Sequence, residues 1–236
     1  MNANEILNNI ETVRRRIISA CKKSGRNPDS VRLLLAVKTV EPEKIRVAVE
    51  AGETLIGENK IQEFAEKNSA LSDLKYEKHF IGHLQTNKLK DIVKYEINCV
   101  QSLDRLELAC KLDRRMQDVG RSIDVMVQVN TSFEKSKFGL EPDSVNPFLK
   151  KLKQYETLNV KGFMTIGLFD SDSENVRPSY TRLREIRDSA VSEGLVHAGC
   201  ELSMGMSGDL ETAIEEGATI IRVGSAIFGT RLYSNK

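Results

Sequence analysis

The chain has 236 residues, 40% of them hydrophobic, which is enough for one sizeable core and short for two. Its 35 basic and 34 acidic residues leave a net charge of +1, so nothing in the charge balance draws it toward nucleic acid or an acidic membrane surface. Its four cysteines, without C-x-x-C spacing, argue against a disulfide framework or a zinc site. With no signal-peptide layout and no apolar run near the ~20 residues of a membrane span, we expect a cytoplasmic protein.

The predicted elements alternate along the chain after a long first helix. That helix covers residues 4–23, with its apolar residues on one stripe, and ends at the breaker SGRNPDS. A later helix is expected to be capped by Ser102 and to end at Gly120. Residues 169–179 are expected to form a mobile loop. Eight short apolar strands are predicted, at 32–38, 54–59, 78–82, 97–102, 123–130, 160–166, 200–205 and 218–224.

The strand pattern predicts the fold class. Several strands are continuous apolar runs, which is typical of parallel strands covered on both faces. Eight of them with helices between favour a (β/α)8 TIM barrel, a single domain over residues 1–236 with an extra N-terminal helix. A doubly wound open sheet is the competing fold. It is less favoured because it normally has fewer units and because no G-x-G-x-x-G follows the first strand.

Lys38 is the most informative residue, because it ends the first strand in LLLAVK. In this fold class the chemistry lies at the carboxyl-terminal ends of the strands. A lysine there can lay its stem along apolar surface and keep its ammonium in water. If the amine is desolvated instead, its pKa falls, and it can react with a carbonyl compound or with pyridoxal phosphate. The residues alone leave both interpretations open.

Two glycine- and serine-containing segments near the carboxyl end can bind an anion. Ser207 in SMGMSGD and the pair Gly224-Ser225 in RVGSAIF each stand before a predicted helix, after the last two strands. The alternative is that Ser207 or Asp209 only caps a helix. Arg222 either points into the barrel mouth or forms a surface ion pair.

Two histidines four residues apart, His79 and His83, could bind a metal from one helix. Gly82 lies between them, and His79 falls in a strand pattern rather than a helical one. We therefore expect no metal site.

Eight segments, in order over nearly the whole chain, carry a family resemblance: AVKT, IGENKIQE, HFIGHLQTNK, VQSLD, VNTSFEKSKFG, GFMTI, ELSMGMSGD and IRVGSAIFGTR. Together they resemble the pyridoxal phosphate homeostasis proteins. The fold of that family is similar to the barrel domain of alanine racemase, the type III fold of pyridoxal phosphate proteins. The resemblance implies that pyridoxal 5'-phosphate is held as a Schiff base on Lys38.

The resemblance also implies roles for residues around the cofactor. Arg222 would face the pyridine nitrogen, and Met204 would line the surroundings of the ring. Asn59 would lie beside the cofactor, with His79 and Asn87 near the site. The phosphate would be bound by Ser207, Gly224 and Ser225. One position departs from the family pattern, because Val37 stands where a small hydroxyl residue usually precedes the lysine.

The resemblance implies a regulator or carrier of the cofactor and of amino-acid pools, without an established reaction. An arginine at the pyridine nitrogen leaves that nitrogen unprotonated, which makes the ring a poorer electron sink. Alanine racemase takes its second base, a tyrosine, from a further domain and a partner subunit, and we expect this chain to lack that domain. We expect a monomer that hands the cofactor transiently to apo-enzymes. The alternatives are a small racemase using Lys38 with Lys137 or His83, and a lysine-imine aldolase or phosphosugar isomerase.

Overall fold

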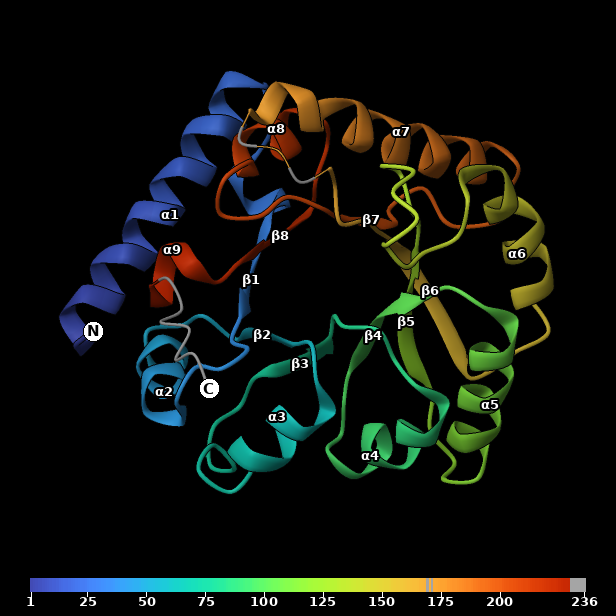
Figure 1. Ribbon diagram of the computed structural model, residues 1–236, viewed down its shortest axis with the longest axis horizontal. Helices are drawn as coiled ribbons and strands as arrows, with labels where there is room; N and C mark the ends of the chain where they lie inside the picture. Colours follow the sequence, from blue (N-terminus) through green and yellow to red (C-terminus); the bar gives the residue numbers. More distant parts are fainter. Residues whose placement is uncertain (169, 171, 230–236) are drawn as a thin grey trace.

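The eight predicted strands form a closed barrel in which every neighbouring pair is parallel (Figure 1). The structure is a computed structural model that describes residues 1–168, 170 and 172–229. Because β8 pairs with β1, the sheet has no open edge. The predicted (β/α)8 barrel is therefore confirmed. The strands are β1 (Arg32–Ala36), β2 (Leu55–Glu58), β3 (Glu77–Phe80), β4 (Cys99–Leu103), β5 (Ile123–Gln128), β6 (Leu158–Met164), β7 (Glu201–Ser203) and β8 (Ile220–Val223).

Helices cover the outside of the barrel and connect successive strands (Figure 1). Short 3-10 turns, η1 (Pro28–Ser30), η2 (Thr86–Lys88) and η3 (Pro142–Ser144), precede β1, α4 and α6. The α-helices are α1 (Ala3–Lys23), α2 (Pro42–Glu50), α3 (Ile61–Lys67), α4 (Leu89–Lys94), α5 (Leu106–Gln117), α6 (Val145–Leu152), α7 (Ser173–Ser192), α8 (Leu210–Glu215) and α9 (Ser225–Phe228). In the part of the chain that the structure describes, no helix is long and apolar enough to cross a lipid bilayer.

The extra N-terminal helix α1 lies against the outside of the barrel and contacts α2, α8 and α9 (Figure 1). A capping box fixes its start: the Asn2 side chain accepts from the Glu5 N–H, and the Glu5 carboxylate accepts from the Asn2 N–H. Most of its apolar stripe is buried, and each buried side chain contributes roughly 1.5–3 kcal/mol of transfer free energy. The buried residues of the stripe are Ile6, Ile10, Val13 and Ile17, whereas Leu7 and Ile18, which were predicted on the same stripe, are exposed.

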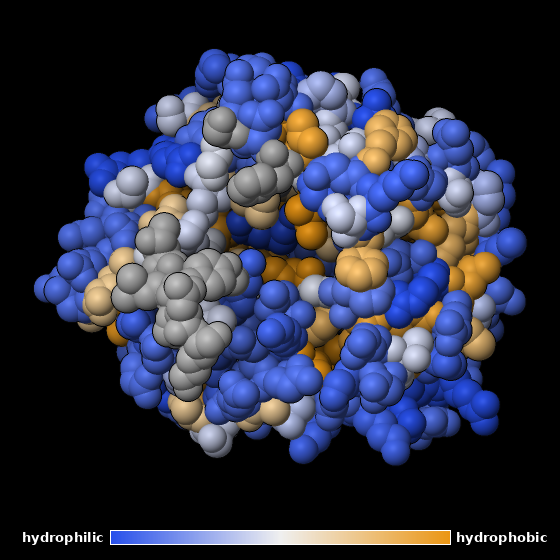
Figure 2. Space-filling view, viewed as in Figure 1, coloured by the Kyte–Doolittle hydropathy of each residue, from blue (hydrophilic) through white to orange (hydrophobic). Residues whose placement is uncertain are grey.

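The apolar core has two parts, because successive residues of a strand face opposite sides of the sheet. An outer core fills the space between the strands and the helices. An inner cluster comes from the side chains that face the barrel axis, namely Leu34, Leu55, Cys99, Met126, Met164 and Ile220. Figure 2 shows the molecule hollowed inside the ring of strands, with hydrophilic and hydrophobic residues both reaching the hollow.

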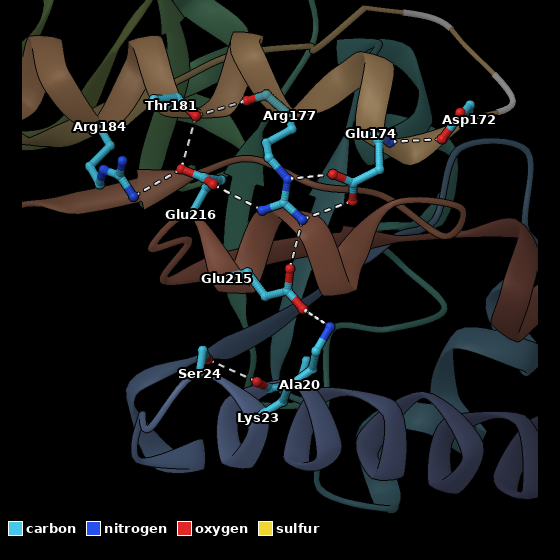
Figure 3. Close-up of polar contacts among 10 residues, drawn as sticks. All are labelled: Ala20, Lys23, Ser24, Asp172, Glu174, Arg177, Thr181, Arg184, Glu215 and Glu216. Atoms are coloured by element: carbon cyan, nitrogen blue, oxygen red, sulfur yellow. Dashed lines mark hydrogen bonds and ion pairs between the residues drawn. The ribbon is translucent and has the colours of Figure 1, made fainter.

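An ion-pair network on the surface joins α1, α7 and α8 (Figure 3). Arg177 of α7 donates to Glu174, Glu215 and Glu216 over distances of 2.7–2.9 Å. Lys23 of α1 reaches the same Glu215 at 2.6 Å. These acceptors raise the pKa of Arg177 above its usual range. We call Glu174, Arg177, Glu215 and Glu216 the Arg177 cluster.

Two sequence expectations about element boundaries were wrong. Ser102 does not cap a helix: it is buried within β4, and α5 begins only at Leu106 after Arg105, with no side-chain cap. The apolar spacing there runs from strand into helix without a break, which hid the boundary. The predicted loop at 169–179 contains the first turns of α7, capped by Asp172, whose side chain accepts from the Glu174 N–H. Residues 169 and 171 lie outside the described residues.

Candidate functional site

The carboxyl-terminal ends of β7, β8, β1 and β2 lie side by side, and most of the predicted site residues follow these strands. Ala36 of β1 lies beside Gly57 of β2, and Leu35 lies beside Val223 of β8. Lys38, Asn59 and the pair Gly224-Ser225 therefore lie at the same end of three neighbouring strands. Ser207 joins them from the loop after β7, the other neighbour of β8. We call this end the mouth.

Lys38 lies at the mouth, but it is exposed rather than sheltered. It stands two residues beyond the end of β1, where the strands no longer enclose the chain. Of the two interpretations of Lys38 that the sequence left open, the structure shows the exposed side chain. The preceding Val37 is buried in the outer core, so its side chain lies against the helices rather than in the mouth.

The loops after β7 and β8 meet at two serines. The Ser225 hydroxyl lies 3.3 Å from the Ser207 hydroxyl, and the Ala226 N–H donates to the same Ser207 oxygen at 3.3 Å. Gly224 lets this loop approach β1 closely, because a Cβ there would lie 2.8 Å from the Ala36 carbonyl oxygen. The result is a small group of hydroxyl and amide donors at the mouth, which suits an anion.

Arg222 is buried, so it does not form the surface ion pair that the sequence left open. Its guanidinium donates to the Ser203 hydroxyl at 2.8 Å and to the Thr165 carbonyl oxygen at 2.7 Å. Burial lowers the pKa of Arg222, yet a guanidinium keeps its charge in proteins. A fixed positive charge thus lies inside the barrel, on the strand that leads to Gly224 and Ser225.

His79 is not at the mouth; it is buried in β3, inside the barrel. Its Nε2 lies 2.7 Å from a Glu77 carboxylate oxygen, and its Nδ1 lies 2.7 Å from the Gln101 amide nitrogen. Because a carboxylate only accepts, Nε2 donates to Glu77, and Nδ1 accepts from Gln101. The hydrogen bond from His79 and the charge of Arg32 outweigh partial burial and lower the pKa of Glu77 to about 2.

The same hydrogen bonds continue to Arg222. The Ser203 hydroxyl donates to the Gln101 carbonyl oxygen at 2.6 Å and accepts from Arg222. In this series of hydrogen bonds, from Arg222 through Ser203, Gln101 and His79 to Glu77, each residue donates to the next. The series holds the guanidinium from inside the barrel. Sequence reasoning did not assign Gln101 or Ser203 a role; the available signal was that each is a polar residue at or near the carboxyl-terminal end of a strand.

Two further residues named from the sequence are not brought into this group. Met204 is fully buried in the outer core, because it alternates with the inward-facing Ser203. Asn87 is exposed in η2. Asn59 follows β2 and, with His83 and Gln85, borders a cavity of about 470 Å³ between α3 and the segment after β3, a cavity whose lining does not include Lys38, Ser207, Gly224 or Ser225.

The two residues considered as a second base are both held by neighbours. Lys137 donates to the Glu134 carboxylate and, at 2.7 Å, to the Gly167 carbonyl oxygen. The His83 ring stacks on Phe138 with 3.7 Å between centroids, and burial lowers the pKa of His83. Within the described ranges, no group of three or more His, Cys, Asp or Glu side chains could hold a metal ion.

Comparison with known proteins gives consistent results in sequence and structure. The sequence profile described as "Alanine racemase, N-terminal domain" matches residues 2–232. A protein of Aquifex aeolicus named pyridoxal phosphate homeostasis protein is 43% identical over 233 residues, covering 99% of this chain and 100% of that protein. The structure of PipY from Synechococcus elongatus with PLP bound has a TM-score of 0.80 at 31% identity, covering 92% of this chain and 100% of the other.

An alanine racemase of Clostridium difficile shares the fold, with a TM-score of 0.73 at 13% identity over 94% of this chain and 57% of the other. The fold and the profile thus define the class of protein, the alanine racemase N-terminal domain family. Within that class, the chain belongs to the family of pyridoxal phosphate homeostasis proteins. The resemblance drawn from the eight sequence segments is confirmed.

Proposed function

We propose that this protein binds pyridoxal 5'-phosphate through Lys38 and acts in cofactor homeostasis as a carrier or regulator, without catalysis. The observation that carries the proposal is the position of the buried Arg222. It lies on β8, the strand beside β1, just before the Gly224-Ser225 turn. The name shared by the relatives and the PLP-bound PipY structure support the same cofactor. We propose that residues 1–236 form one cofactor-binding domain.

The residues at the mouth fit this cofactor. When bound, pyridoxal phosphate supplies an aldehyde that condenses with a primary amine with loss of one water. Lys38 offers such an amine in an exposed position. The serine and glycine donors after β7 and β8 would hold the phosphate, and Arg222 would face the ring nitrogen and keep it unprotonated. Asn59 would lie beside the ring, at the end of the neighbouring strand.

The surroundings of the mouth favour a carrier over a racemase. A racemase needs a second base opposite the lysine, and Lys137, one of the two candidates, is held by other groups. Its ammonium donates to the Glu134 carboxylate and to the Gly167 carbonyl oxygen. We therefore expect no exchange of the α-hydrogen when the loaded protein is incubated with amino acids in deuterated water, as followed by mass spectrometry. Steady exchange would restore the racemase alternative.

An absorbance spectrum followed by borohydride reduction and peptide mapping tests the proposed site. The wild-type protein should carry a reducible adduct on Lys38, and Lys38→Ala should carry none. Lys60→Ala is the matched control, because Lys60 is also exposed and follows the neighbouring strand β2. The adduct should survive in that control. A reducible adduct that persists in Lys38→Ala would contradict the assignment.

We further propose a cytoplasmic monomer that passes the cofactor transiently to apo-enzymes. The four cysteines are all free, which is usual in a reducing compartment. Light scattering should give a mass near 26.5 kDa for the loaded protein. A stable dimer would contradict the monomer. Transfer to an apo-enzyme at the same rate in wild type and Lys38→Ala would contradict a role for the lysine in holding the cofactor.

A further inference from the structure

Lys67, the last residue of α3, is a buried lysine whose three ammonium donors all have acceptors. Its Nζ lies 2.6 Å from a Glu58 carboxylate oxygen, 2.7 Å from a Glu63 carboxylate oxygen and 2.8 Å from the Val37 carbonyl oxygen. The lysine side chain is only 9% exposed. Since a buried ammonium needs such partners, this arrangement is specific rather than incidental. We call Glu58, Glu63 and Lys67 the Lys67 cluster.

The Lys67 cluster holds the backbone on both sides of Lys38. Lys67 binds the carbonyl of the preceding residue, Val37. Glu63, through the same oxygen that contacts Lys67, accepts the N–H of the following residue, Thr39, at 3.1 Å. The cluster therefore fixes the residues before and after the lysine that we assign to the cofactor.

The backbone at Thr39 needs such support. Its φ is +62°, a left-handed conformation that is unfavourable for a β-branched residue. Backbone of this kind persists when the surrounding structure over-determines it. Here the Thr39 hydroxyl also donates to the Lys38 carbonyl oxygen at 2.6 Å. Removing the contacts of the Lys67 cluster would let the turn relax and move the lysine.

The cluster has two carboxylates for one ammonium, so it carries excess negative charge when fully ionised. Burial raises the pKa of Glu58 to about 7, against the pull of Lys67 and with the help of the Glu63 and Glu66 charges. Burial also opposes the ionised form of Glu63, but hydrogen bonds from Lys67 and Thr39 outweigh it and lower its pKa. Glu63 is therefore the permanent partner of the lysine, and Glu58 is the one that titrates.

We propose that the Lys67 cluster is a positioning device for Lys38: it sets the turn from which the amine reaches the mouth, without touching the cofactor. The inference rests on the proposed function of Lys38. Lys67 and Glu63 are positioning residues in this scheme. The simpler alternative is that the cluster only fastens α3 to β2 and leaves the Lys38 turn as it is.

Hydrogen exchange in the cofactor-free protein tests the contact with Thr39 directly. Glu63→Ala removes the acceptor, so the Thr39 amide should exchange about tenfold faster, the loss of one hydrogen bond. Glu63→Gln keeps a carbonyl oxygen at that position and should restore most of the protection. Lys111→Met is the control, because Lys111 pairs with Glu107 at the same i,i+4 spacing on exposed α5. It should leave Thr39 unchanged.

Cofactor release tests the consequence for Lys38. Lys67→Met and Glu63→Ala should release pyridoxal phosphate about tenfold or more faster than wild type, because a displaced group loses its productive geometry. The readout is the decay of the bound-cofactor absorbance in the presence of a trapping amine, in variants that far-UV circular dichroism shows to be folded. Glu63→Gln and Lys111→Met should release the cofactor at rates close to wild type.

The outcomes separate the inference from the proposed function. If wild type carries no adduct on Lys38, the proposed function fails, while the exchange result at Thr39 still decides whether the turn is held. If wild type carries the adduct and Glu63→Ala changes neither Thr39 exchange nor release, the inference is overturned. Should Lys67→Met fail to fold, the Glu63→Ala and Glu63→Gln pair decides the question alone.

Discussion

The Lys67 cluster and the Arg177 cluster have similar composition but differ in how deeply the central cation is buried. Each centres on one cation shared by two or more glutamates. The Lys67 side chain is 9% exposed and its two glutamates are 1% and 14% exposed, whereas the Arg177 side chain is 29% exposed and its glutamates range from 11% to 62%. The buried cluster lies behind the Lys38 turn, and the exposed one joins three surface helices (Figure 3).

The difference shows that burial, rather than the number of ion pairs, decides what such a cluster does. Water screens the Arg177 cluster, so each of its pairs contributes little to stability. In the Lys67 cluster the charged groups have lost water. Removing one partner therefore costs several kcal/mol of the free energy of unfolding, and each remaining contact depends on its geometry. A backbone carbonyl and a backbone N–H take part only in the buried cluster, which is why it can fix the course of the chain.

The largest expected effect comes from removing each central cation. Lys67→Met should lower the free energy of unfolding by about 3–5 kcal/mol, because it leaves Glu58 and Glu63 without their cation. Arg177→Met should cost about 1 kcal/mol, because water replaces its contacts. Urea denaturation at pH 8 followed by circular dichroism measures both. Equal losses from the two variants would remove the contrast between the clusters.

The pH dependence of stability gives an intermediate effect. The pKa of Glu58 is raised to about 7 from a reference of 4.5, so the folded state holds this proton more tightly than the unfolded state. This contribution to stability is complete below pH 4.5 and is lost as the pH rises through about 7. Relative to wild type, Glu58→Gln should therefore gain roughly 3 kcal/mol between those pH values.

Urea midpoints measured at intervals from pH 4.5 to pH 8 test this change. Glu174→Gln, in the exposed cluster, is the control, because its carboxyl has a lowered pKa rather than a raised one. It should not reproduce the gain. A constant difference between wild type and Glu58→Gln over the whole range would contradict the raised pKa.

Salt gives the smallest effect and sharpens the comparison. Raising NaCl from about 0.1 M to about 1 M shortens the Debye length from about 10 Å to about 3 Å. The stability difference between wild type and Arg177→Met should then shrink toward zero, while the difference for Lys67→Met should persist. Thermal unfolding at the two salt concentrations measures this. A loss of both differences would mean that the buried cluster is open to water.

Much of the fold could be predicted because its signals are local. Each predicted strand overlaps an observed one, since a buried parallel strand is a short apolar run whatever lies around it. The boundary near Ser102 could not be predicted, because strand and helix patterns overlap there. The same limit hid the start of α7, where a polar segment reads as a loop until Asp172 caps it.

The site was predictable in part for a similar reason. Lys38, Ser207 and the Gly224-Ser225 pair each stand at a recognisable strand end, and the structure brings them to one mouth. The position of His79 was harder to predict, because nothing near a histidine in a strand pattern indicates which residues it will hydrogen-bond in the folded protein. Lys67 gave no signal at all: in the sequence it is an ordinary lysine in the last turn of a short helix.

The sequence by itself determined the barrel and the residues at the strand ends, because spacing, glycines and apolar runs act over a few neighbouring residues, and the resemblance of eight segments indicated the family. Only the tertiary structure decided that Lys38 is exposed, that Arg222 is held from within the barrel, and that Lys67 reaches across to the Val37 carbonyl. Those outcomes depend on which groups lose water when distant segments pack, and desolvation is a property of the assembled fold.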